Sequence, residues 1–277
     1  VKPIYAPRVY IAISEGFRSP RTRMGDWANL PILFAVDDVD RDGKVTIDRE
    51  AIATMPMRNL EGRMKVQAIV RINPDWMLPG DGDGDLYSET QWVEFVKNEH
   101  VDLTFDANVV VPAPVFRDEG AIQDHYFKSD KLSAFHKRDY NMRYSVILPD
   151  EWDKTKKYPV IIYVTGFSAV HHKSTRRIKR QFGEKGKRAI IVIADANCRW
   201  GHSVFANSAV NGPWGDALTY ELLPHIDKTY GGAGAEHRYI TGVSSGGWTS
   251  AWAIATYPDA YAEAWPVSPD PVDFERF

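Results

Sequence analysis

The sequence contains very little cysteine and has no long apolar run. Its 277 residues include a single cysteine, Cys198, so no disulfide can form within the chain. One thiol in a chain of this length suits an oxidising compartment, and we expect an extracellular or periplasmic location. No apolar run approaches the roughly 20 residues that a membrane-spanning helix needs. We therefore expect no membrane segment in this sequence.

An excess of charge of either sign is also missing. The chain has 34 basic and 37 acidic residues and a formal net charge of −3. This balance argues against a nucleic-acid binder and against a protein that binds membrane surfaces. The apolar content of 44% and the charged content of 26% are typical of a globular protein with a substantial core.

The hydrophobic pattern of residues 1–115 is that of short strands. Alternating apolar residues and turn residues predict a small all-β, sandwich-like domain without a catalytic motif. Residues 116–138 are polar with little periodicity, and they are expected to form a linker or an edge element. The strands expected in the first domain are Val9–Ser14, Ile32–Val36, Lys65–Ile72, Gln91–Val96 and Val101–Phe105.

Residues 139–277 show a different pattern, in which buried strands alternate with helices. Tyr158–Val164 and Ala189–Ala194 are nearly continuous apolar runs, as in parallel strands buried on both faces. Helical periodicity follows in Lys173–Lys185 and Trp214–Tyr230. Met142–Leu148 alternates and is expected to be an exposed strand. This order predicts an α/β domain.

The clearest catalytic motif is Gly242-Val243-Ser244-Ser245-Gly246. It follows an expected strand, Arg238–Thr241, and precedes an expected helix that begins near Gly247. This is the pattern of a nucleophile elbow, in which glycines two residues before and after the serine, here Gly242 and Gly246, permit the tight turn. The backbone N–H groups of Ser245 and of Phe167, in the loop after the first buried strand, are the expected oxyanion donors.

Met142–Phe274 resembles the putative-esterase group of α/β-hydrolases, whose relatives include feruloyl and acetyl-xylan esterases, S-formylglutathione hydrolase and mycolyltransferases. The resemblance implies Ser244 as the nucleophile, with Phe167 and Ser245 forming the oxyanion hole. Thr165-Gly166 stands where the group usually has His-Gly, and the strands that would carry the acid and the histidine are missing. The matching segments are Arg143–Pro149, Tyr158–Phe167, Gly201–Ser208, Asn211–Asp216, Tyr239–Gly247 and Ser268–Phe274.

No histidine follows Ser244, although the α/β-hydrolase triad runs from serine to acid to histidine. Among the upstream histidines, His171, His172, His225 and His237 are expected to have structural or surface roles, with His225 solvated. We therefore expect the catalytic histidine and acid on residues outside this chain, in a C-terminal segment or a companion chain. That segment should pair with Ala262–Val267, an apolar strand that would otherwise be a bare edge.

Four further residues are predicted to line the substrate site. The first lies in the loop after the expected strand Ala189–Ala194, at the edge of the sheet where ligands bind, the next two lie beside it, and the fourth follows the expected strand Ala262–Val267. They are His202, Asn211, Trp214 and Asp270.

Two acidic loops have some features of calcium sites. Asp38, Asp40 and Asp42, followed by Gly43, match the first half of a calcium loop, but Arg49 stands where the bidentate glutamate would be. The segment Gly80–Asp85 is similar. Hairpin loops built from aspartate and glycine explain both segments better. We expect no metal and no organic cofactor for the reaction.

Three functions remain open. The first is a serine carboxylic-ester hydrolase that forms an acyl-enzyme on Ser244 and acts on a small-molecule or carbohydrate-linked ester. The second is an acyltransferase to a sugar or lipid alcohol. The third is a non-catalytic binding protein on a hydrolase fold. The elbow and the oxyanion loop together favour the hydrolase.

Overall fold

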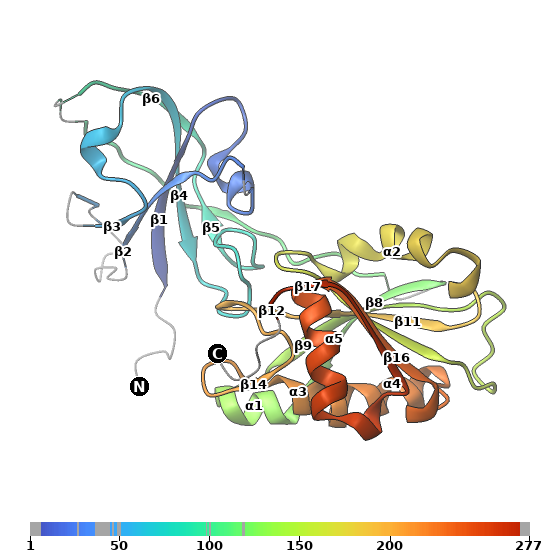
Figure 1. Cartoon of the computed structure of the whole chain (residues 1–277). Helices are drawn as coiled ribbons and strands as arrows, with labels where there is room; N and C mark the ends of the chain where they lie inside the picture. Colours follow the sequence, from blue (N-terminus) through green and yellow to red (C-terminus); the bar gives the residue numbers. More distant parts are fainter. Residues whose placement is uncertain are drawn as a thin grey trace. The chain divides into compact units, whose positions relative to one another are not determined.

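The computed structural model divides into two compact units, Val1–Pro114 and Val115–Phe277. Each unit is described by itself (Figure 1). The structure describes residues 7–26, 28–36, 45, 47–48, 51–97, 99, 101–117 and 120–271. In these residues no helix is both long and apolar enough to cross a membrane.

The first unit is built on an antiparallel sheet with the strand order β3-β2-β1-β4-β5-β7, and β6 also pairs with β4. Two short 3₁₀ turns, η1 (Pro20–Arg23) and η2 (Met57–Asn59), lie between strands. The predicted β-rich character of this unit is thereby confirmed. The strands are β1 (Arg8–Ser14), β2 (Ile32–Val36), β3 (Ile52–Ala53), β4 (Gly62–Arg71), β5 (Leu86–Tyr87), β6 (Gln91–Phe95) and β7 (Val109–Val110).

Alternation along the strands places apolar side chains on both faces of this sheet. Ile13 and its register partner Val66 belong to one buried cluster, whereas Tyr10 and its partner Ile69 belong to another. The described strands therefore form one sheet with an apolar cluster on each face. The expected strand Val101–Phe105 is wrong, because this segment forms no described strand pairing and only Phe105, its last residue, packs against a buried cluster.

The second unit contains a mixed sheet in the order β17-β16-β10-β11-β9-β8. Its central strands β16, β10 and β11 run parallel, and so does β17 beside β16, whereas β9 and β8 are antiparallel to their neighbours. The α/β prediction is confirmed. The strands are β8 (Ile122–Lys128), β9 (Asn141–Ile147), β10 (Val160–Val164), β11 (Ile190–Asp195), β16 (Arg238–Ser244) and β17 (Glu263–Pro269).

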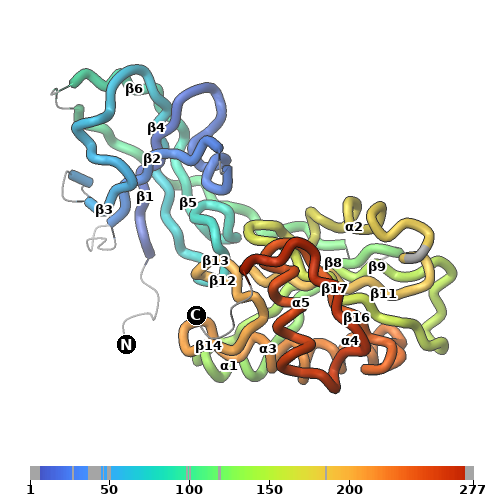
Figure 2. The backbone as a smooth tube through the Cα atoms, viewed as in Figure 1, coloured from blue at the N-terminus to red at the C-terminus, as the bar shows by residue number. Residues whose placement is uncertain are grey.

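Helices cover both faces of this sheet, as Figures 1 and 2 show, with α2 on one side and α5 on the other. Trp214–Tyr230 is helical as predicted, but its middle turn, η3 (Leu218–Leu222), is a π-helix. The helices are α1 (Asp130–His136), α2 (His171–Gly186), α3 (Trp214–Ala217), α4 (Leu223–Tyr230) and α5 (Ser245–Thr256). Short elements complete the unit: the ribbons β12 (Asn197–Cys198) with β13 (Gly201–His202) and β14 (Asn207–Ser208) with β15 (Gly212–Pro213), and the 3₁₀ turns η4 (Ala235–His237) and η5 (Pro258–Ala260).

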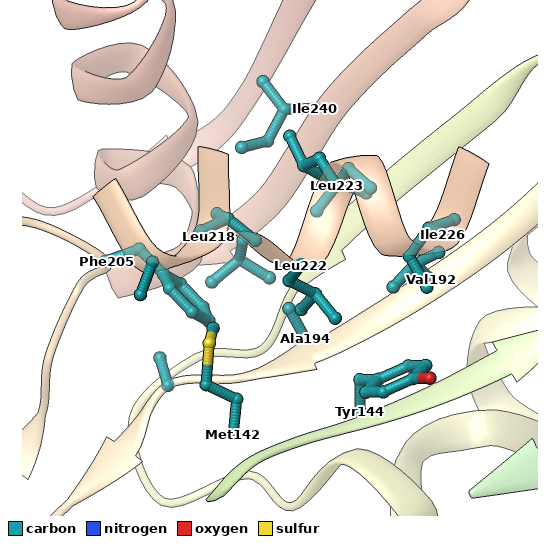
Figure 3. Close-up of a cluster of buried hydrophobic side chains, with 14 of the residues drawn as sticks. Met142, Tyr144, Val192, Ala194, Phe205, Leu218, Leu222, Leu223, Ile226 and Ile240 are labelled. Atoms are coloured by element: carbon teal, nitrogen blue, oxygen red, sulfur yellow. The ribbon is translucent and has the colours of Figure 1, made fainter. Parts of the chain in front are cut away.

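Two hydrophobic clusters hold the helices to the sheet. Alternate residues of β10 divide between them: Val160, Ile162 and Val164 face the cluster under α3–α5, and Ile161 and Tyr163 face the one under α2. Figure 3 shows the first cluster, where the helical stripe of Leu218, Leu222, Leu223 and Ile226 lies over Val192 and Ala194 of β11. The continuous apolar runs therefore form strands buried on both faces.

The strand at Met142–Leu148 is interior, which corrects the expectation that it is exposed. β9 lies between β11 and β8, and nearly all of its residues are buried. The neighbour β8 comes from the polar segment that was expected to be a linker or an edge element, and it forms the edge strand. The sequence of β8 does not show the apolar alternation of a strand, because several of its residues are polar, including the buried Asp124.

The opposite edge is β17, which pairs with β16 alone among the described strands. Trp265 and Val267 are 46% and 44% exposed, and Trp265 stacks on Tyr239 with ring centroids 5.4 Å apart. An edge of this kind is a ready template for pairing with a further strand. That a segment outside this chain covers it stays a prediction.

Asp124, whose side chain is buried, ties β8 to the neighbouring elements through an ion pair with the partly exposed Arg117, which predicts an acid-sensitive fold. Arg117 Nε donates to its Oδ2 at 2.6 Å, and Ser145 Oγ donates to its Oδ1 at 2.6 Å. Burial by itself would raise the pKa of Asp124, but the bonds from Arg117 and Ser145 outweigh it and lower the pKa to about 2. The carboxyl therefore binds protons more readily in the unfolded chain, and its stabilising effect is lost as the pH falls from about 4 to about 2.

The expected acid dependence is measurable by urea unfolding over a pH series. In wild type, Asp124 should add a loss of about 2 kcal/mol in the free energy of unfolding between about pH 5 and pH 2. Asp124→Asn should be less stable near neutrality and should lack this part of the slope. Asp139→Asn is the matched control, because Asp139 pairs with Lys128 with 76% of its side chain exposed. Equal acid slopes in all three proteins would contradict the assignment.

Candidate active site

Ser244 lies at the sharp turn from β16 into α5. Its backbone has φ 57° and ψ −123°, a region that a residue with a side chain rarely adopts, and α5 begins at the next residue. Strained backbone of this kind persists only where the surroundings hold it and is concentrated at functional sites. The turn presents the serine beyond the carboxyl end of the strand, as a nucleophile elbow does.

The two flanking glycines are required by close backbone packing. A Cβ on Gly242 would lie 2.6 Å from the carbonyl oxygen of Val164, and one on Gly246 would collide with that same oxygen. Both glycines therefore let β16 and α5 approach β10. The predicted reason for glycine at these two positions agrees with the geometry.

The loop after β10 lies directly beside the serine. Val164 pairs with Gly242 in the parallel sheet, so both strands end at the same edge. A Cβ on Gly166 would lie 3.2 Å from the Val243 carbonyl oxygen and 3.9 Å from Ser244 Cβ. The residues proposed as oxyanion donors, Phe167 and Ser245, thus flank Ser244 from the loop and from the first turn of α5. Their catalytic role stays a prediction.

The hydroxyl of Ser244 donates a hydrogen bond to an aspartate. Ser244 Oγ donates to Asp270 Oδ1 at 2.9 Å, and Ser245 Oγ donates to the other oxygen, Oδ2, at 2.7 Å. Asp270 follows β17 and is half-buried. The residue predicted to line the substrate site is therefore in direct contact with Ser244.

His202 is half-buried, and both of its ring nitrogens are bonded to backbone. Nε2 donates to the Thr165 carbonyl oxygen at 2.8 Å, and Nδ1 accepts from the Val204 N–H at 3.1 Å. Burial lowers the pKa of His202, against a smaller raising effect of its bond to Thr165, and this favours the neutral ring that the two bonds require. Because Nδ1 already accepts a hydrogen bond from the Val204 N–H and Nε2 carries the proton donated to Thr165, neither nitrogen is available to receive the proton of Ser244.

Trp214 does not line the site, which corrects the prediction. Its side chain is 1% exposed and packs against Phe205 and Tyr140 in the core, while its Nε1 donates to the Asn211 carbonyl oxygen at 3.0 Å. A tryptophan at this position in the sequence is compatible with a place in the core and with a place in the substrate site, so the sequence alone does not decide between the two. Asn211 itself is half-buried, and its substrate role stays a prediction.

The four histidines that were predicted to have structural or surface roles contact other parts of the second unit or lie on its surface. His171 is fully buried and its Nδ1 donates to Asp195 Oδ2 at 2.8 Å, and burial lowers the pKa of the adjacent His172 to about 4. His225 is half-buried against the hydroxyl of Tyr144, 3.2 Å from its Nε2, so the expectation that it is solvated is wrong. His237 is exposed at the opposite end of β16. None of these contacts involves Ser244.

Asp195 is a site-supporting residue that sequence reasoning missed. At the end of β11 it is 1% exposed, and its carboxylate accepts from His171 and from both the backbone N–H and the Nδ2 of Asn197. Arg143 Nε lies 3.5 Å from the same carboxylate. An aspartate at the carboxyl end of a buried strand was the available signal, since that end of a parallel sheet faces the site.

The loop Gly80–Asp85 is organised by hydrogen bonds to backbone, as the hairpin interpretation predicts. Asp85 is fully buried, and its carboxylate accepts from the N–H groups of Ile72, Asn73, Gly80 and Gly82 at 2.7–3.3 Å. Asp38, Asp40 and Asp42 lie outside the described residues. Across the part of the chain that the structure describes, no group of three or more His, Cys, Asp or Glu residues could hold a metal ion.

Comparison with known proteins places the second unit in a family. A family model described as putative esterase matches residues 136–273. No curated protein sequence matches the chain.

The fold is similar to that of several solved structures. One is a fluorophosphonate-binding serine hydrolase of Staphylococcus aureus, with 21% identity, a TM-score of 0.43, and coverage of 54% of this chain and 57% of that one. A ferulic acid esterase of Anaeromyces mucronatus, solved with ferulic acid, has 22% identity, a TM-score of 0.43, and coverage of 54% and 58%. An S-formylglutathione hydrolase of Agrobacterium tumefaciens has 15% identity, a TM-score of 0.43, and coverage of 52% and 56%.

The chain thus spans little more than half the length of these solved proteins. Through residues 136–273, the chain belongs to the putative esterase family of α/β-hydrolases.

Proposed function

We propose that this chain is the nucleophile-bearing part of a serine carboxylic-ester hydrolase. The observation that carries the proposal is the strained elbow at Ser244, with Gly166 so near that a Cβ added to it would lie 3.9 Å from Ser244 Cβ. Ser244 Oγ attacks the acyl carbon and the N–H groups of Phe167 and Ser245 stabilise the oxyanion. The ester C–O bond then breaks, the alcohol leaves with the proton that the base took from Ser244, and water releases the acid from the acyl-enzyme. These steps use only groups of the polypeptide and water.

The base that takes the proton of Ser244 is proposed to be a histidine outside this chain. Within the described residues, the hydrogen-bond partner of Ser244 Oγ is Asp270. His202, His171 and His225 are committed to other partners, and His237 lies at the other end of the strand. The exposed edge of β17, next to Asp270, offers a backbone surface on which a further segment could bring such a histidine to the serine.

A non-catalytic binding function is the second candidate, and one observation favours it. The hydroxyl of Ser244 is bonded to a carboxylate instead of an imidazole in the described structure. Against it stands the strained geometry of the elbow, which costs free energy of about 1–3 kcal/mol and is of use only if the serine reacts.

The substrate is proposed to be a small-molecule or carbohydrate-linked ester, with the first unit binding the carrier of that ester. An extracellular or periplasmic location is proposed from the single thiol, Cys198, which is 3% exposed.

Covalent labelling by an organophosphonate tests the function. The expected result is a stoichiometric adduct that peptide mapping places on Ser244, with labelling accelerated when free imidazole is supplied. Ser244→Ala should abolish the adduct, whereas Ser245→Ala, which keeps the oxyanion N–H, should still be labelled. A folded protein whose Ser244 remains unlabelled under all these conditions would support the binding function instead.

A further inference from the structure

We propose that the β12–β13 hairpin clamps the oxyanion loop, and that His202 is its main positioning residue. The proposal deepens the proposed function, since the loop has an oxyanion to bind only if Ser244 reacts. It gives the hairpin, which the reaction scheme does not otherwise use, a defined task. The clamp acts on the backbone of the loop and does not touch the reacting atoms.

Both ends of the loop are bonded to this one hairpin. His202 Nε2 donates to the carbonyl oxygen of Thr165, the residue before Gly166, at 2.8 Å. Asn197 Nδ2 donates to the carbonyl oxygen of Ala169, the residue after Ser168, at 2.8 Å. Asn197 and His202 are register partners across the hairpin. Two paired side chains therefore bracket the segment Gly166–Ser168.

The bracketed segment is a tight turn whose shape needs such support. Ser168 has a left-handed backbone with φ 62°, and the Ala169 N–H bonds back to the Gly166 carbonyl oxygen at 3.1 Å. Phe167 is 43% exposed at the tip of this turn. An oxyanion donor must be held within a fraction of an ångström of its working position, and the hydrogen bonds at the two ends supply that restraint.

The orientation of the His202 ring is itself enforced by the residues that follow it. Its Nδ1 accepts the Val204 N–H at 3.1 Å, and Val204 and Phe205 have left-handed φ angles of 48° and 45°. Such angles are unusual for any residue with a side chain and are genuine outliers for a β-branched valine. Phe205 is 1% exposed in the core, so the strained turn is anchored there and fixes which nitrogen faces Thr165.

The hairpin is in turn anchored to the sheet through Asp195. Asn197 donates to Asp195 Oδ1 from its backbone N–H at 2.9 Å and from Nδ2 at 2.6 Å. Arg143, from the next strand, donates to the Asn197 carbonyl oxygen at 2.7 Å. The clamp is therefore a chain of direct hydrogen bonds from the rigid strands β9 and β11 through the hairpin to the loop.

Three substitutions at one position separate the donor of His202 from its acceptor. His202→Gln can keep the bond to Thr165, because its side-chain amide can place an N–H donor near the position of Nε2. The shorter side chain of His202→Asn reaches only the position of Nδ1, so this variant can keep the bond from Val204 and loses the bond to Thr165. His202→Ala removes both. His237→Ala is the matched control, because it removes an exposed histidine at the far end of β16.

The experiment measures hydrogen exchange of the 165–169 amides and the rate of Ser244 phosphonylation in the presence of imidazole, both below the melting transition of every variant. His202→Ala and His202→Asn should exchange faster and be labelled roughly 10–100-fold more slowly, below the cost of deleting an oxyanion donor outright. His202→Gln should stay within about threefold of wild type, and His237→Ala should be unchanged.

The outcomes distinguish the clamp from the function on which it rests. If wild type is not labelled at all, the proposed function fails, while the exchange pattern still decides whether the clamp exists. If wild type is labelled and all three His202 variants match it in exchange and in rate, the clamp is overturned. A lowered melting temperature with unchanged loop exchange and rate would assign His202 a purely structural role and would also overturn it.

Discussion

Gly246→Ala is expected to destabilise the second unit by about 3 kcal/mol or more, at the upper end of the cost of overpacking. The added Cβ would collide with the carbonyl oxygen of Val164 and would lie 3.1 Å from that of Thr165. Both contacts are with backbone, so no side-chain rotation relieves them. α5 must move away from β10, and the Ser245 N–H moves with it. Thermal or urea unfolding measures the loss, and labelling of Ser244 should fall with it.

Gly25→Ala is the matched control for this substitution. Its added Cβ would meet only the Cδ1 of Leu78 at 2.9 Å, the mobile end of a side chain, and Gly25 has no positive φ. This variant should unfold within about 1 kcal/mol of wild type, because a flexible neighbour can yield. If Gly246→Ala were as stable as Gly25→Ala, the close approach of β10 and α5 at the elbow would be contradicted.

Asp195→Asn is expected to cost about 3–5 kcal/mol, since it removes the buried carboxylate that balances the charge of Arg143 and accepts a hydrogen bond from His171. Arg143 and Asp195 are 6% and 1% exposed, and the carboxylate also accepts from His171. Burial alone would raise the pKa of Asp195, but the charge of Arg143 and the bond from His171 outweigh it and hold the pKa well below its usual value. The contribution of Asp195 to the free energy of unfolding is therefore fully present above about pH 4 and decreases as the pH falls below that value.

An exposed acid provides the comparison for Asp195. Asp150 lies 3.8 Å from Lys187 with 57% of its side chain exposed, so Asp150→Asn should change the free energy of unfolding by less than about 1 kcal/mol. Asp195→Asn should in addition speed hydrogen exchange in the hairpin and the oxyanion loop. If both variants were equally stable near neutral pH, the buried network would not support the site as inferred.

The elements closest to Ser244 could be predicted because short-range sequence determines them. The glycines at 242 and 246, the apolar run before Thr165 and the helix after Ser245 are local patterns with one structural outcome. Parallel pairing then brings Gly166 to Ser244, as the α/β order of strands and helices implies. The fold of the second unit and the position of the loop after β10 follow from these features.

The polar contacts of the site could not be predicted in the same way. The bond from Ser244 to Asp270 joins residues 26 positions apart, and the bond from His202 to Thr165 joins residues 37 apart. Each depends on the conformation of a loop, which has no periodicity to read. Two further outcomes depend on tertiary contacts that the sequence does not show. Trp214, predicted to line the site, fills the core. The polar segment that contains β8 forms a strand, in which Asp124 is paired with Arg117.

Detection of an acyl-enzyme tests most directly whether Ser244 acts as a nucleophile when a base is supplied. The protein is mixed with an activated aryl ester, with and without imidazole, and quenched in acid before peptide mapping. We predict an acyl group on Ser244 that accumulates faster with imidazole and is absent from Ser244→Ala. A correctly folded protein that carries no acyl group on Ser244 under either condition, or that is acylated to the same extent when Ser244 is replaced by alanine, would contradict a catalytic role for this serine.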